Sequence, residues 1–131
     1  MKKIENKIFS FAETHKGLTD VLLDHKLASL GDAYVNFVYS LALSEKKGQP
    51  FGAKVRGSTL SEALKKAGLR THMPSRVTSH MLADAAEALI VYAWLHKSVT
   101  IEECVKILRE AENFIEGFAC LLLTVLDRIT F

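Results

Sequence analysis

The chain has 131 residues, of which 49% are hydrophobic and 24% are charged, and its formal net charge is +2. This length fits one domain, and the composition excludes a disordered protein. The longest apolar runs are far shorter than the roughly 20 residues of a membrane span, and the N-terminus has no signal-peptide core. We therefore expect a cytoplasmic protein with no membrane partner.

Glycine, proline and cysteine usage indicate the fold class. Two prolines and seven glycines are few, which favours one all-α domain over residues 1–131. The two cysteines, Cys104 and Cys120, lie in apolar helical stretches and lack metal-ligand spacing. We expect both to be reduced core residues.

Apolar spacing predicts helices in the first half of the chain. A short helix is expected over residues 3–14. Residues 27–44 are apolar on most sides, as is typical of a central helix, and Gly48 ends this run. Ser58 is expected to cap a helix over residues 59–67.

Start signals also mark the helices of the second half. Pro74 is expected at the first position of a long helix over residues 75–96. Thr100 and Glu103 form a capping-box pattern that begins the next helical region. Gly117 either breaks or bends that region before its end.

The long apolar helix carries its few polar side chains on one face. They are spaced three, four and four residues apart, which aligns them in one stripe of Ser29, Asp32, Asn36 and Ser40. Gly31 costs about 1 kcal/mol of helix propensity, so we expect another helix to approach closely there. An ionised Asp32 on a buried helix must be paired, hydrated or metal-bound.

A second polar stripe lies on the helix expected over residues 75–96. Its members, spaced four, four and three residues apart, are Arg76, His80, Asp84 and Glu87. The two helices can bring Asp32, Asp84 and Glu87 together. Oxygen ligands suit Mg²⁺ or Mn²⁺, and Mg²⁺ favours phosphodiester hydrolysis. Alternatively, the pair Asp84 and Glu87 belongs to a solvated face, and Asp32 is a structural acid that is hydrogen-bonded within the protein.

Positive charge is concentrated in the middle of the chain. Eight lysines and arginines lie between Lys46 and Arg76, against only Glu62. Such an excess can attract a polyanion, although a solvated lysine-rich surface explains it equally well. The candidates for phosphate contact are Lys46, Lys47, Lys54, Arg56, Lys65, Lys66 and Arg70.

Two sequence motifs resemble those of the ribonuclease III family. Leu27-Ala-Ser-Leu-Gly-Asp-Ala33 resembles the family signature, and Leu82-Ala-Asp-Ala-Ala-Glu-Ala-Leu-Ile90 resembles its second acidic motif, in the family's order and at about its spacing. The resemblance implies a ribonuclease III endonuclease-domain-like helical bundle. It also implies a homodimer that uses magnesium to cleave double-stranded or structured RNA.

The resemblance assigns roles to individual residues. Asp32, Asp84 and Glu87 match the metal-binding catalytic acids of the two motifs. Glu62 could match a further family acid. Asn36 and His80 are the other candidates for side chains that support the ligands.

The chain also departs from the family signature. The family's glutamate four residues before the aspartate is replaced by Ala28, and the aromatic residue after it by Ser29. The compact Mini-III branch, which cleaves RNA, also has Leu-Ala-x-x-Gly-Asp-Ala here, and like that branch this chain is expected to lack a double-stranded RNA-binding domain.

Two alternative functions remain open. One is a non-catalytic RNA-binding or ribosome-associated module with the same fold, and the other is a helical dimerisation domain whose acids pair with Arg76 or lysines.

Overall fold

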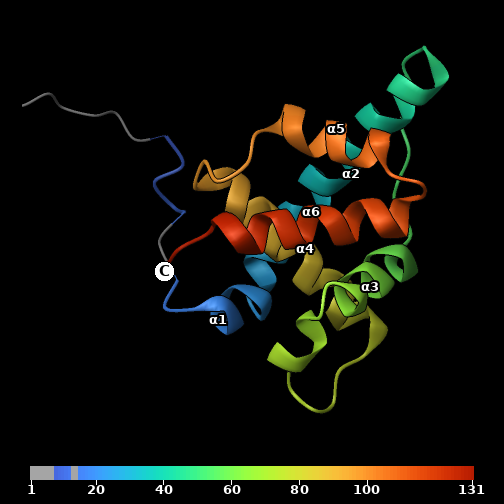
Figure 1. The fold of residues 1–131 in the computed structure, drawn as a ribbon. Coiled ribbons are helices and arrows are strands. Elements are labelled where there is room, and N and C mark those ends of the chain that lie inside the picture. The colour runs from blue at the N-terminus through green and yellow to red at the C-terminus, as the bar shows by residue number, and fades with distance from the viewer. Residues whose placement is uncertain (1–7, 13–14) are drawn as a thin grey trace, which may run out of the picture.

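The computed structural model describes residues 8–12 and 15–131, and all regular structure in this part of the chain is helical. The expectation of an all-α fold is therefore confirmed. Figure 1 shows the helices as one bundle in which α4 lies at the centre. The elements are α1 (Leu18–Leu22), α2 (His25–Lys47), α3 (Gly57–Lys66), the 3₁₀ helix η1 (Leu69–His72), α4 (Ser79–Leu95), α5 (Ile101–Glu110) and α6 (Phe114–Arg128).

Helix α4 forms the core because most of its surface is apolar. Nearly every residue from Leu82 to Leu95 is buried, and α4 packs against α1, α2, α3 and α6. An all-round apolar helix is stable only when other helices cover it. The acids at its N-terminal half therefore lie next to the core.

Helix α2 confirms the helix predicted over residues 27–44 and extends it at both ends, but it buries only one face, so the expectation that it is the central helix is wrong. It begins at His25 because the Asp24 side chain accepts a hydrogen bond from the Leu27 amide at 3.0 Å. It ends at Lys47, where Gly48 adopts the left-handed conformation with a φ of 71°. The stripe of polar side chains thus lies wholly within one helix.

The helix predicted from Pro74 begins later than expected. Arg70 donates hydrogen bonds to the carbonyls of Pro74 and Ser75 at 3.1 and 2.9 Å, which holds this segment outside the helix. Thr78 caps α4 instead, by accepting from the Met81 amide at 3.1 Å. Arg76 therefore lies outside α4 and does not extend its polar stripe.

Two further predicted helix boundaries shift. Ser58 lies inside α3, because Arg56 occupies the N-cap position and no side chain caps this helix. The break near Gly117 falls earlier, where Asn113 caps α6 by accepting from the Glu116 amide at 2.9 Å. A Cβ on Gly117 would lie 3.1 Å from the Leu108 side chain, so this glycine permits close packing of α6 on α5.

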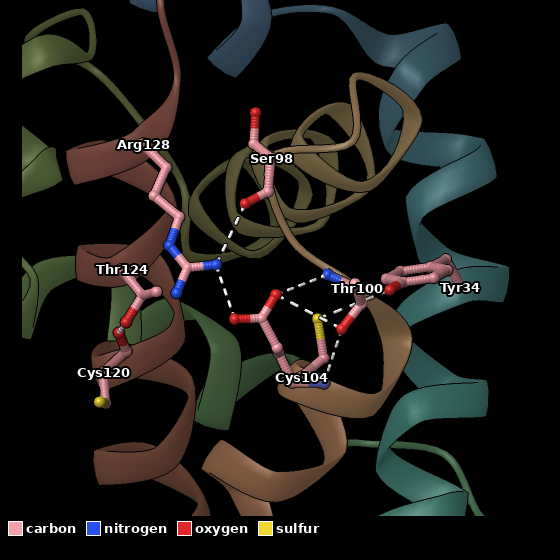
Figure 2. A network of polar contacts seen from close by, with 8 residues as sticks. Tyr34, Ser98, Thr100, Cys104, Cys120, Thr124 and Arg128 are labelled. Carbon is pink, nitrogen blue, oxygen red and sulfur yellow. Dashed lines mark hydrogen bonds and ion pairs between the residues drawn. The ribbon is translucent and has the colours of Figure 1, made fainter.

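The capping box at Thr100 and Glu103 is confirmed, and it takes part in a wider polar network (Figure 2). Arg128 of α6 donates to the Ser98 carbonyl at 3.2 Å and to the Glu103 carboxylate at 2.7 Å. These contacts join the last helix to the start of α5. None of them involves Asp32, Asp84 or Glu87, so their role is to hold the bundle together.

The two cysteines differ in their environment. Cys104 is buried, as expected, and its Sγ lies 3.5 Å from the Tyr34 hydroxyl (Figure 2). Cys120 is exposed on α6, so the prediction that it is a core residue is wrong. Both are free thiols.

The N-terminal helix predicted over residues 3–14 lies largely outside the described residues. Its described part, residues 8–12, forms a turn in which the Ala12 amide donates to the Phe9 carbonyl. Among the helices that the structure describes, none has the length and hydropathy needed to cross a membrane.

Candidate active site

A pocket of about 390 Å³ lies between α2, α3 and α4. Its lining includes all three acids singled out in the sequence, Asp32 from α2 and Asp84 and Glu87 from α4. The structure therefore brings these side chains to one place. The remaining lining residues are His25, Ala28, Ser29, Val55, Gly57, Leu60, His80 and Ala83.

Close packing of α2 on α4 sets the spacing of the acids. A Cβ added to Gly31 would lie 2.2 Å from the backbone carbonyl oxygen of Glu87. Only glycine permits this approach, which confirms the expectation of a close helix crossing at this position. Since Asp32 follows Gly31 directly, the crossing holds Asp32 beside Glu87.

Glu87 is the buried acid of the site. Glu87 is only 6% exposed. Acidic residues are rarely buried unless a partner stabilises them. Burial, a hydrogen bond with Asp32 and the charges of Asp32 and Asp84 raise its pKa to about 8. Without a cation, the pocket therefore retains a proton on Glu87 near neutral pH. A cation that replaced this proton would relieve the repulsion among the three carboxylates.

The other two acids lie nearer to solvent and each has a polar neighbour. The Asn36 amide nitrogen donates to Asp32 Oδ1 at 3.1 Å. His80 Nε2 lies 3.4 Å from Asp84 Oδ2, and the histidine side chain is 84% exposed at the rim. Asn36 and His80 thus contact the acids that they were expected to support.

Glu62, in contrast, is not among the residues that line the pocket. It lies exposed on α3 and accepts a hydrogen bond from Lys65 at 3.4 Å. Ala28 is buried in the pocket wall, at the position where the family signature has a glutamate. The pocket therefore offers three carboxylates.

The carboxylates of the pocket form a donor set for a hydrated divalent cation, not for an ion that the protein encloses completely. Among the described residues, no three histidine, cysteine, aspartate or glutamate side chains lie close enough together to hold a metal ion by themselves. Mg²⁺ keeps several of its waters and is usually bound through one or two carboxylates plus substrate phosphates. An all-oxygen set with a buried Glu87 and a solvent-facing Asp32 fits a hydrated ion of this kind.

Helix α2 makes a ladder of hydrogen bonds with the segment before α3, which was not predicted from the sequence. The Asn36 side chain accepts from the Val55 amide at 2.8 Å, and the Ser40 hydroxyl both donates to the Ala53 carbonyl and accepts from its amide at 2.9 Å. The Ser44 hydroxyl contacts Phe51 in the same way. The stripe thus has two parts, since its first half lines the pocket and its second half binds residues 51–55.

A spacing signal for this ladder was present in the sequence. Ser44 continues the four-residue spacing of the stripe beyond Ser40. Four residues of helix advance about 6 Å and two residues of extended chain about 6.6 Å, so alternate residues of an extended segment meet successive stripe residues. The segment follows a short turn, which returns it along α2.

The candidate phosphate-binding residues differ in how far they are already engaged. Lys65 and Lys66 pair with Glu62 and Glu116, and Arg70 donates to two backbone carbonyls. In the described part of the chain, the side chains of Lys54 and Arg56 form no hydrogen bond or ion pair. Both flank Val55, which lines the pocket. Lys46 and Lys47 lie over the rings of Phe114 and Phe51.

The pairing expected of a pure dimerisation domain is not observed. Of the ion pairs formed by described residues, none joins Asp32, Asp84 or Glu87 to a lysine or arginine. Arg76 lies in the irregular segment before α4. The three acids are left facing the pocket.

Comparison with known proteins agrees with the two sequence motifs. The family model for ribonuclease III matches residues 25–129, which include both motifs and every helix from α2 to α6. The chain belongs to the ribonuclease III family, in a compact form. No match was found among curated proteins.

Proposed function

We propose that this protein is a metal-dependent endoribonuclease that hydrolyses phosphodiester bonds in double-stranded or structured RNA during RNA processing. One observation carries the proposal. In a chain of the ribonuclease III family, three carboxylates from α2 and α4 line a single pocket, and one of them, Glu87, is buried there without a cationic partner among the described residues. Such a pocket favours a hard divalent cation, Mg²⁺ or Mn²⁺.

The acids of this chain would divide the work according to their contacts. Glu87 and Asp32 are the direct ligands, since they share a hydrogen bond and face each other across the helix crossing. Asp84, which is partly buried and lies next to His80, binds the ion or one of its waters. When bound, the ion would lower the pKa of an attacking water and neutralise charge that develops on the phosphoryl oxygens.

Contacts to RNA are expected to be to its backbone. Double-stranded RNA is recognised mainly through phosphates and 2′-hydroxyls across its minor groove. Lys54 and Arg56, on either side of a pocket residue, are the best placed of the seven candidates. With a net charge of only +2, binding should be modest and sensitive to salt.

A homodimer is part of the proposal. The face of α2 beside the stripe exposes Leu30, Ala33 and Phe37, which are three and four residues apart, and Phe37 is 55% exposed. A second copy of the chain packing there would bury these apolar side chains. It would also place two pockets in one particle, as cleavage of both strands of a duplex requires.

Cleavage of a long RNA duplex tests the enzymatic proposal. The purified protein should cut the duplex in the presence of Mg²⁺ or Mn²⁺ and be inactive with EDTA. The Asp84→Asn and Glu87→Gln variants should lose at least about 100-fold in rate, because each removes one charge from the ligand set. Equal cleavage by wild type and variants, or none with either metal, would refute it.

A second candidate is a non-catalytic RNA-binding or ribosome-associated module. Buried Ala28, in place of a fourth carboxylate, is the observation that favours it. This candidate predicts salt-dependent retention of RNA with no metal-dependent cleavage. The same cleavage assay, run beside a binding assay, therefore separates the two candidates.

A further inference from the structure

The ladder between α2 and residues 51–55 ends at the candidate metal site. Its first rung is Asn36, whose Oδ1 accepts from the Val55 amide at 2.8 Å and whose Nδ2 donates to Asp32 Oδ1 at 3.1 Å. An amide N–H can only donate and an ionised carboxylate can only accept, so these two partners fix which way the Asn36 side chain faces. One side chain thus bridges an acid of the pocket and the backbone beside Lys54 and Arg56.

The other rungs do not reach the pocket. Ser40 binds Ala53 through two hydrogen bonds of 2.9 Å, and Ser44 binds Phe51. Neither serine lines the pocket, and neither contacts an acid. They hold the segment against α2, while only Asn36 connects it to Asp32.

This arrangement gives the segment a fixed distance from the acids. Val55 lines the pocket, and the neighbouring Lys54 and Arg56 side chains are exposed. A phosphate contacted by either cation would lie on a backbone segment that Asn36 ties to Asp32. Displacing the segment would then move Asn36, and moving Asn36 would reorient the Asp32 carboxylate.

We propose that Asn36 is a positioning residue that couples the RNA-contacting segment 51–56 to Asp32, so that contact with RNA and orientation of the metal ligand depend on each other. This proposal rests on the proposed function, in that it assigns the ligand role to Asp32. Asn36 itself contacts neither metal nor RNA. Partners of metal ligands typically contribute 10- to 100-fold to metal affinity or activity, which sets the size of the expected effect.

The test compares Asn36→Ala with Ser40→Ala. Both variants loosen the segment, but only the first removes a contact to Asp32, so Ser40→Ala is the matched control. Mn²⁺ binding is measured by electron paramagnetic resonance, and affinity for an RNA duplex is measured separately in EDTA. Both variants should bind RNA more weakly, whereas only Asn36→Ala should weaken Mn²⁺ binding, by about 10-fold. Equal Mn²⁺ affinity in the two variants would overturn the proposal.

A reciprocal measurement keeps the test independent of catalysis. Hydrogen exchange of the Val55 amide reports the rung at Asn36 in the metal-free protein, where no cleavage is needed. Asp32→Ala should accelerate this exchange, because Asn36 loses one of the two partners that hold it, while Ser29→Ala on the same stripe should not. Unchanged Val55 exchange in Asp32→Ala would refute the coupling, even if the protein cleaves RNA. Absence of Mn²⁺ binding in the wild type, with accelerated exchange in Asp32→Ala, would refute the metal site and leave the coupling supported.

Discussion

Gly31 lies directly against the backbone of Glu87, and a Cβ at this position would come within 2.2 Å of the Glu87 carbonyl oxygen. The contact is between helices α2 and α4, at the point where each contributes an acid to the pocket. Because the atom approached is a backbone oxygen in a buried helix, it cannot move aside as a flexible side chain would. The stability of the fold and the geometry of the candidate site therefore depend on the same glycine.

Gly31→Ala should destabilise the protein. The gain of about 1 kcal/mol in helix propensity is outweighed by forcing α2 away from α4, for which overpacking costs of about 1–3 kcal/mol or more are typical. The free energy of unfolding, from urea denaturation, should fall by about 1 kcal/mol or more. Gly57→Ala is the matched control, since its Cβ would lie 4.0 Å from the Ala83 Cβ, and it should be neutral or stabilising. A Gly31→Ala protein as stable as wild type would contradict the crossing.

Glu87→Gln should change how stability depends on pH in the metal-free protein. The pKa of Glu87 is raised from 4.5 to about 8 in the folded state, so the folded protein holds a proton that the unfolded chain releases. Stability is then lost as pH rises from about 4.5 to about 8. The variant stays uncharged and should lack this loss, which makes it more stable than wild type at pH 8 by an amount on the order of 1–4 kcal/mol.

Thermal unfolding across this pH range measures the difference. Exposed Glu62, which pairs with Lys65, supplies the control Glu62→Gln, which should follow the wild-type curve. Added Mg²⁺ should stabilise the wild type at pH 8 and have little effect on Glu87→Gln, because the ion replaces the proton on Glu87. Parallel pH curves for wild type and Glu87→Gln would show that burial and the neighbouring carboxylates do not raise the pKa of Glu87.

Lys54→Ala and Arg56→Ala should each weaken binding to an RNA duplex. Each removes a cation with no partner among the described residues, so the slope of log affinity against log salt should become shallower by about 1 per variant. Lys66→Ala is the control, because Lys66 already pairs with Glu116. Filter binding at several salt concentrations gives the slopes. A larger effect from Lys66 than from Lys54 and Arg56 would place the RNA on another face.

Phe37→Glu should convert a dimer into a monomer. Phe37 and Leu30 are exposed on the same face of α2, and a buried charge without a partner is costly at an apolar interface. Analytical ultracentrifugation should show a wild-type dimer and a monomeric variant. Leu123 on α6 is similarly exposed, at 51%, so Leu123→Glu tests whether any new surface charge has this effect. A monomeric wild type, or a dimeric Phe37→Glu protein, would contradict the proposed interface.

Features that depend on neighbours in sequence could be predicted well. The apolar run of α2, the capping box at Thr100 and the shared face of Asp84 and Glu87 all follow from spacing along one helix, and the structure contains each. The two motifs also identified the family that residues 25–129 match. The close approach at Gly31 could be inferred because glycine is costly in a helix interior.

Features that depend on competition between segments could not be predicted. Pro74 is a good helix start, but the Arg70 guanidinium binds the carbonyls of Pro74 and Ser75, and Thr78 then caps the helix. Cys120 lies in an apolar stretch, but its side chain is on an exposed side of α6. The role of the second half of the stripe required knowing that residues 51–55 return along α2.

The most direct test of the metal site is X-ray diffraction from crystals soaked in Mn²⁺, with anomalous data collected near the manganese absorption edge. The expected result is an anomalous peak in the pocket, in contact with Asp32 and Glu87 and beside Asp84, that disappears in Glu87→Gln crystals. A pocket without a peak in wild-type crystals, or a peak unaffected by Glu87→Gln, would contradict the claim that these three carboxylates form a metal site.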